Sequence, residues 1–200
     1  MSVTNNIFLL ADRYVDELAA LQPMLATQMG VPGFDGQWGT QDPSGWQDIG
    51  ALFKRTLSAI EALPPSELHR EQFGRRVLKD HLSGRLDRIE HDHPLQDLNN
   101  IASPVQGFRE TFDLMPKVGA DDWELIASRL SSLHEAVAGY IESLSEGRRR
   151  GLVTARRQVE ACIAQCRVNS GPGSFFCQLL AGVSDAQMPD ALRAEVDTGT

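Results

Sequence analysis

Long apolar runs, cysteine and tyrosine are scarce in this chain of 200 residues, which has three cysteines and two tyrosines. No window approaches the roughly 20 consecutive apolar residues that a membrane-spanning helix needs, so we expect no contact with a membrane. The amino end, MSVTNNIFLLADRYVDEL, lacks the basic and apolar segments of a signal peptide. An odd number of cysteines without an export signal favours reduced thiols and a cytoplasmic protein.

Basic residues are also in short supply. The chain has 19 lysines and arginines against 27 aspartates and glutamates, which gives a formal net charge of −8. Binding to nucleic acid requires a dense cationic face, so this balance argues against nucleic acid as a partner. The single basic run, Arg148-Arg149-Arg150, is interpreted as a solvated helix end, where cations suit the exposed carbonyl groups.

Alternating apolar and polar residues, the pattern of a half-buried strand, are missing throughout. Apolar residues recur instead every three or four positions, which predicts an all-α protein of about seven to nine helices in an irregular antiparallel bundle. We expect one helical region over residues 1–200, with an irregular loop at 30–45, where Gly, Pro and Asp are frequent. The predicted helices cover residues 7–21, 46–60, 66–89, 105–115, 121–144, 154–166 and 175–180, with another beginning near Pro189 and ending after Val196.

Several of these helices have recognisable ends. Asn5 or Asn6 can cap the first helix, and Ser66 can cap the helix that Pro94 follows. The stretch 94–103 is predicted to be a connector between helices. In it, Asp97 and Asn99 can bind nearby backbone amides, and Ser103 can cap a helix that begins with Pro104.

The common catalytic motifs are absent: there is no H-E-x-x-H, G-x-S-x-G or glycine-rich phosphate loop. His91-Asp92-His93 resembles the start of a metal site, but residues two apart on a helix point about 200° apart. Cys162 and Cys166 could share a helix face, yet no second Cys or His pair follows them. We therefore predict no metal site and no catalytic residue, and expect Cys162, Cys166 and Cys177 to be buried as small apolar side chains.

Five segments, in the same order, resemble a bacterial family known as domain of unknown function 885: ADRYVDELAALQPMLATQMGVPGFDG, DLNNIASPVQGFRETFDLMP, DDWELIASRL, GYIESLSEGRRRGLVTARRQVE and SFF. The resemblance extends from about Phe8 to about Val196. It implies a large, helical protein similar to zinc peptidases, in which the H-E-x-x-H helix lies in a later part of the chain than is present here. It also implies that this chain is a truncated gene product, part of a split gene, or a fragment.

The leading hypothesis is therefore a non-catalytic amino-terminal region that covers one side of a substrate cleft. Zinc is expected only in a fuller relative, and Asp97, Asn99, Ser103, Arg109 and Asp113 are the candidate cleft or connector residues. A second hypothesis is a stand-alone helical module that binds another protein. A third, more remote one is an independent metal-dependent hydrolase that uses His81, His91 and His93.

The expected partner is the remaining carboxy-terminal half of the protein or a second copy of the chain. A half-domain would leave apolar helix faces uncovered, and we expect those of Phe175, Phe176 and Leu179 to be exposed. The isolated chain is then expected to dimerise, aggregate or melt at a low temperature.

Overall fold

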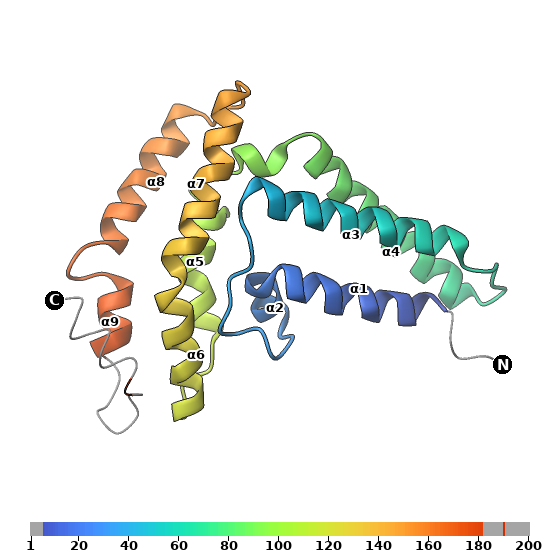
Figure 1. Cartoon of the computed structure of the whole chain (residues 1–200), viewed down its shortest axis with the longest axis horizontal. Helices are drawn as coiled ribbons and strands as arrows, with labels where there is room; N and C mark the ends of the chain where they lie inside the picture. Colours follow the sequence, from blue (N-terminus) through green and yellow to red (C-terminus); the bar gives the residue numbers. More distant parts are fainter. Residues whose placement is uncertain (1–5, 182–189, 191–200) are drawn as a thin grey trace.

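The described part of the chain in the computed structural model, residues 6–181 and 190, is all-helical and contains no strand. Figure 1 shows the α-helices, whose order along the chain is α1 (Ile7–Leu21), α2 (Pro23–Met29), α3 (Pro43–Ala62), α4 (His69–Glu90), α5 (Pro104–Leu114), α6 (Ala120–Ser131), α7 (Leu133–Arg149), α8 (Arg156–Asn169) and α9 (Phe175–Ala181). A short 3-10 helix, η1 (His93–Gln96), follows α4. The predicted fold class is confirmed.

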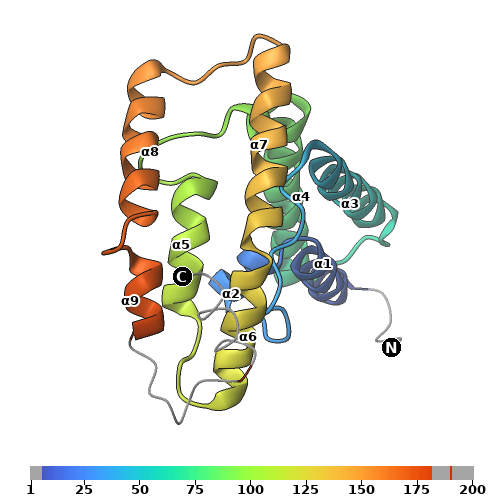
Figure 2. The same cartoon turned by 60° about the vertical axis from the view of Figure 1, so that its left-hand side comes forward.

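Two hydrophobic clusters organise these helices. The first cluster joins α1, α3 and α4, and its buried members include Leu18, Leu52, Phe53, Ile60 and Leu82. The second cluster joins α5, α6, α7 and α9 and includes Trp38, Phe108, Phe112, Ile126, Tyr140 and Leu179. Figures 1 and 2 show the helices of the first cluster lying across those of the second, with α8 at the outer edge.

The irregular loop that follows α2 is held by a buried arginine of α6. The Arg129 side chain is completely buried, and its guanidinium donates to the carbonyl oxygens of Gln37, at 2.6 Å, and Phe34, at 3.1 Å, and to the hydroxyl of Thr27, at 3.0 Å. Trp38 Nε1 donates in return to the Arg129 carbonyl oxygen at 2.7 Å. Burial lowers the pKa of Arg129 to about 10. The loop is therefore irregular in backbone but fixed in place.

Three residues on one face of α7 contact the loop before α3 and the segment formed by η1 and the connector that follows it. Ser143 Oγ donates to the Gln41 carbonyl oxygen at 2.7 Å, at the end of the loop before α3. Tyr140 Oη donates to the Asp97 carbonyl oxygen at 2.7 Å, in the connector after η1. Gly147 lies directly against η1, because a Cβ atom there would stand only 2.0 Å from the Leu95 carbonyl oxygen.

Four helix boundaries differ from the sequence-based expectation. The helix predicted at 121–144 is two helices, because α6 ends at Ser131 and the backbone turns at Ser132. Ser66 does not cap α4, which begins at His69 after Leu68; its hydroxyl binds the Leu68 amide instead. The loop predicted at 30–45 ends earlier, because Asp42 caps α3 and Pro43 is its first residue. The predicted restart at Thr154 lies two residues before Arg156, where α8 begins.

Other boundary predictions can be compared directly. Asn6 caps α1, with Oδ1 accepting from the amides of Phe8 and Leu9 at 2.9 Å and 3.0 Å. The helix expected from Pro189 to Val196 lies outside the described residues. Within the described part of the chain, no helix is both long enough and apolar enough to cross a bilayer.

Candidate functional site

The connector between η1 and α5 is shaped by the side chain of Asn99. Asn99 Oδ1 accepts from the amides of Ile101 and Ala102, at 2.9 Å and 2.7 Å, and Nδ2 donates to the Ala102 carbonyl oxygen at 3.1 Å. Ser103 is the N-cap of α5, and its amide donates to Gln106 Oε1 at 2.8 Å as one half of a capping box. These local bonds form the turn that the sequence suggested at Asn99 and Ser103.

Asp97 contributes in a different way from the one that the sequence suggested. Its backbone carbonyl oxygen, not its carboxylate, receives the buried Tyr140 hydroxyl. Burial raises the pKa of the Asp97 carboxyl, although the charges of His93 and Arg88 oppose the rise. Burial also raises the pKa of Tyr140, with the Asp97 charge adding to the effect.

A chain of amide side chains ties the connector to α8. Gln106 Nε2 donates to Gln165 Oε1 at 2.6 Å, and Gln165 Nε2 donates to the Asn100 carbonyl oxygen at 3.1 Å. The Asn100 amide donates in turn to Gln158 Oε1 at 2.9 Å. Because these bonds are polar and partly exposed, α8 is held to the connector by directional contacts rather than by a close-packed core.

Arg109 and Asp113 form an ion pair on α5, with 2.6 Å between Nη2 and Oδ2. The Arg109 guanidinium also lies over the ring of Phe175, 4.7 Å from its centroid. Arg109 lines the two spaces beside α5, and Asp113 lines neither of them.

An apolar groove lies between α7 and α8, with α5 at its base and Phe176 of α9 at one end. Its volume is about 640 Å³. The apolar side chains that line it are Leu98, Val105, Phe108, Leu133, Val137, Ile141, Leu144, Val159, Ile163 and Phe176. Ile141 of α7 is 56% exposed and Ile163 of α8 is 45% exposed. Exposed isoleucines beside a buried core indicate a surface that another apolar surface can cover.

A second, more polar cavity of about 490 Å³ adjoins this groove and shares Val105, Arg109 and Asn169 with it. Asn100, Gln106 and Gln165 supply amide groups to its wall. Of the five candidate residues, only Arg109 lines these two spaces. Asn99 and Ser103 shape the connector beside them through their local hydrogen bonds. Asp97 faces a separate cavity, and Asp113 is a partner of Arg109.

The three histidines of the hydrolase hypothesis do not share one cavity, because His81 and His93 line the cavity beside α4 and His91 does not. His91 pairs with Asp87, 3.3 Å between Nδ1 and Oδ1, and this neighbour raises the His91 pKa. His93 lies in η1 with its ring nitrogens 3.1 Å and 3.2 Å from Arg88 Nη2. Within residues 6–181, no group of three His, Cys, Asp or Glu side chains is placed to hold a metal ion. The arrangement gives no support to the independent hydrolase with His81, His91 and His93 as ligands.

The expectation that all three cysteines are buried is wrong for two of them. Cys162 is buried, and its thiol donates to the Asn99 carbonyl oxygen at 3.2 Å. Cys166 and Cys177 are exposed. Helical periodicity cannot separate Cys162 from Cys166, because they stand four residues apart on one side of α8 and both line the groove.

The expectation that α9 presents a bare apolar face is also wrong. Leu179 is buried in the second cluster, and Phe176 packs edge-on against Phe112 with 5.7 Å between ring centroids. Phe175 packs in turn against Phe176 at 5.4 Å. The exposed apolar side chains that line the groove belong instead to α7 and α8, at Ile141 and Ile163.

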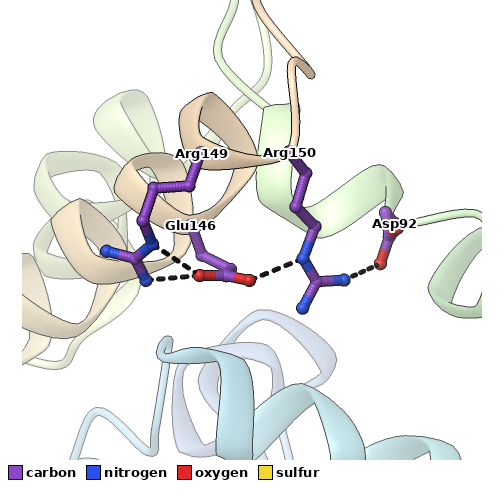
Figure 3. Close-up of polar contacts among 4 residues, drawn as sticks. All are labelled: Asp92, Glu146, Arg149 and Arg150. Carbon is purple, nitrogen blue, oxygen red and sulfur yellow. Dashed lines mark hydrogen bonds and ion pairs between the residues drawn. The ribbon is translucent and has the colours of Figure 1, made fainter.

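Two residues of the basic run at the end of α7, Arg149 and Arg150, form ion pairs. Figure 3 shows the Glu146 carboxylate between Arg149 and Arg150, and Arg150 reaching across to Asp92. Arg150 Nε lies 2.6 Å from Glu146 and its Nη1 lies 3.0 Å from Asp92. Asp92 has a left-handed backbone, with φ of 57°, so this contact fixes the sharp turn that ends α4.

A comparison with known protein families identifies the family of this chain. The family described as "Bacterial protein of unknown function (DUF885)" matches residues 23–199. The chain belongs to this family. No curated protein matches it. The DUF885 match covers both connecting segments, the second cluster and the groove, so these features belong to the region that the family shares.

Sequence reasoning missed two residues that organise this region of the DUF885 chain. Arg129 stands three positions after Ile126, on the buried side of α6, and that spacing was the available signal. Gln165 carries the bond from α8 to α5, but a single glutamine on a polar helix gives no pattern that would distinguish it.

Proposed function

We propose that this chain is the non-catalytic amino-terminal helical region of a zinc-peptidase-like protein, and that the groove between α7 and α8 receives an amphipathic helix of the peptidase-like region. The family resemblance supports the peptidase-like assignment. The observation that carries the docking proposal is the apolar groove itself, open at Ile141 and Ile163.

The shape of the groove favours a helix over a compact ligand. It extends along α7 from Leu133 to Leu144, and along α8 from Val159 to Asn169. Eleven residues of helix span about 16 Å, which is about three turns. An elongated apolar channel of that length matches the i, i+3, i+4, i+7 stripe of an amphipathic helix. Few polar groups converge in it, which disfavours a small polar substrate.

In this arrangement the connector and α5 lie beside the docked helix and form one wall of the substrate cleft. Arg109, at the boundary between the apolar groove and the polar cavity, then stands where a peptide substrate would pass. The zinc ion would be held by the peptidase-like region and would activate water there. The residues of this chain would position the substrate and exclude solvent.

The first test is the coding DNA beyond codon 200, searched in all three forward frames for H-E-x-x-H within a helical pattern. A segment that carries the motif, co-expressed with this chain, is expected to form a one-to-one complex that retains zinc. Ile141→Glu and Ile163→Glu should each weaken that complex, because a carboxylate is introduced into an apolar contact. Val118→Glu is the matched control, since Val118 is 83% exposed and lies outside the groove.

The outcomes separate the proposals. No motif in any frame, or a complex unaffected by both isoleucine variants, would remove the peptidase-like docking proposal. A monomer with a cooperative thermal transition would favour the second candidate, a stand-alone module that uses the same groove for another protein. That candidate is favoured by α9, which already covers the second cluster.

A further inference from the structure

A separate cavity lies on the other side of the molecule, between α3, α4 and η1. Its volume is about 360 Å³. Trp46 and Phe53 of α3 supply aromatic walls. Four basic side chains line the same cavity: His81, Arg85, Arg88 and His93. Such a concentration of basic groups is unusual in a chain whose net charge is −8.

The two arginines of this cavity have no acidic partner. Within residues 6–181, neither Arg85 nor Arg88 forms an ion pair. The neighbouring acids pair with other cations instead: Asp87 with His91, Glu90 with Lys54, and Asp92 with Arg150. The cavity therefore keeps two permanent positive charges that its surroundings do not neutralise by contact.

One carboxylate, that of Asp97, also lines the cavity. Burial raises the pKa of this group, and the positive charges of His93 and Arg88 oppose the rise. Asp97 offsets one of the two arginine charges when it is ionised. A net positive charge remains, before any contribution from the histidines.

Arg85 has two aromatic groups near it, of which Phe53 lines the cavity and Tyr14 does not. Its guanidinium lies over the Phe53 ring, 5.6 Å from the centroid, and the ring of Tyr14 lies 6.2 Å from the same phenylalanine. The Tyr14 hydroxyl is buried and has no hydrogen-bond partner among the described residues. The charge of Arg85 opposes the rise in the Tyr14 pKa that burial causes.

The geometry points to a binding site for a small oxyanion, a phosphate or carboxylate group carried on an apolar or aromatic body. Arg85 and Arg88 stand one turn apart on α4 and present guanidinium forks that suit oxyanions. Trp46 and Phe53 would contact the apolar body. This site is independent of the groove between α7 and α8 and shares no lining residue with it.

The experiment is calorimetric titration of the 200-residue chain with phenyl phosphate, benzoate and inorganic phosphate. Saturable binding of one phenyl phosphate or benzoate per chain is expected. Inorganic phosphate should bind more weakly because it has no ring to place against Trp46. Preference between the first two ligands decides whether the site takes phosphate or carboxylate. Arg85→Gln and Arg88→Gln are each expected to weaken binding by about tenfold or more, because each removes a charge-assisted contact.

Arg76→Gln is the matched control. It removes the same charge from the same helix, but Arg76 lies outside the cavity, so affinity should change by less than about twofold. Equal weakening in all three variants would show non-specific attraction and overturn the proposal. The absence of saturable binding of every ligand up to about 10 mM would overturn it as well.

Tryptophan fluorescence gives a test that needs no arginine variant. Trp46 lines the cavity, whereas Trp38 and Trp123 belong to the second cluster. Ligand should therefore change the emission of the unaltered chain, and Trp46→Phe should abolish the change while leaving calorimetric binding within about threefold. Persistence of the change in Trp46→Phe would place the ligand elsewhere and contradict the site.

Discussion

A polar outer helix lies beside each hydrophobic cluster, and the two helices are held in different ways. In the first cluster, α4 buries only Leu82 completely, but Leu78, Leu86 and Ile89 pack against α3. Beside the second cluster, α8 buries only Cys162, and its aliphatic side chains line an open groove. Hydrogen bonds accepted by the side-chain oxygens of Gln158 and Gln165 hold α8 instead. We infer that α4 unfolds with its cluster, whereas α8 can open alone.

The largest effect is expected for Arg129, which holds the loop after α2 against α6. Arg129→Met should lower the free energy of unfolding by about 4 kcal/mol, because it leaves the buried carbonyl oxygens of Gln37 and Phe34 without donors. Urea denaturation followed by circular dichroism measures this. Arg148→Met, on the exposed end of α7, is the control and should change stability by less than about 0.5 kcal/mol. Equal losses would show that the Arg129 contacts are unimportant.

Gly147→Ala tests the close approach of α7 to η1. The added Cβ would lie 2.0 Å from the Leu95 carbonyl oxygen, so one backbone segment must move, at a cost of about 3 kcal/mol. Gly84→Ala is the matched control, because a Cβ at Gly84 in α4 meets open space. That change should stabilise the chain by up to about 1 kcal/mol. A neutral Gly147→Ala in thermal unfolding would contradict the contact.

A pair of identical substitutions compares the clusters directly. Ile60 is 4% exposed in the first cluster, whereas Ile163 is 45% exposed along the groove. Ile60→Ala should therefore cost about 2 kcal/mol more than Ile163→Ala, because the second change removes little buried surface. Chemical denaturation of both variants gives the difference. If Ile163→Ala were as costly, the groove would be closed in the isolated chain.

Gln165→Ala tests the comparison of the two outer helices, because it removes the side chain whose hydrogen bonds hold α8. It is expected to cost about 1 kcal/mol, confined to α8 and the connector. Hydrogen exchange should show faster exchange of α8 amides and unchanged rates in α1 and α3. Gln178→Ala, whose side chain bonds locally to the Gly173 carbonyl oxygen, is the control. Faster exchange throughout the chain would show that α8 does not open separately.

The smallest expected effect is the pH dependence of stability that arises from the Asp97 carboxyl. Burial raises its native pKa above the unfolded value, so the native state binds the proton more tightly. Its contribution to stability is therefore fully favourable below the unfolded pKa, near 3.9, and declines as pH rises through the native pKa. Asp97→Asn should remove that decline. Carboxyl NMR titration supplies the native pKa, and a value below the ordinary one would reverse the sign.

Much of the architecture follows from local sequence signals. Pro23, Pro43 and Pro104 begin helices because proline suits the first helical turn, and Asn6 and Asp42 supply caps. The break at Ser132 escaped prediction because the apolar spacing continues from Leu130 to Leu133 across it. The period of the apolar residues indicates which side of a helix is buried. It does not indicate whether the backbone hydrogen bonds of the helix are continuous.

The candidate surface was predictable only in part. Asn99 and Ser103 could be assigned because their bonds join near neighbours in the chain. The groove could not, because it depends on the spacing between α7 and α8, which polar bonds 58 or more residues apart determine. The positive charge of the cavity between α3, α4 and η1 could not be predicted from the sequence either. Its excess of positive charge arises because Asp87, Glu90 and Asp92 pair elsewhere in space.

The anchoring face of α7 has a consequence for insertions and deletions. Tyr140, Ser143 and Gly147 meet the connector, the loop and η1 at intervals of three and four residues. One residue inserted between Tyr140 and Gly147 would rotate everything beyond it by about 100° and shift it by about 1.5 Å, so these contacts could not all be kept. Insertions and deletions in this segment should therefore destabilise the fold, whereas the exposed linker around Val153 should tolerate them.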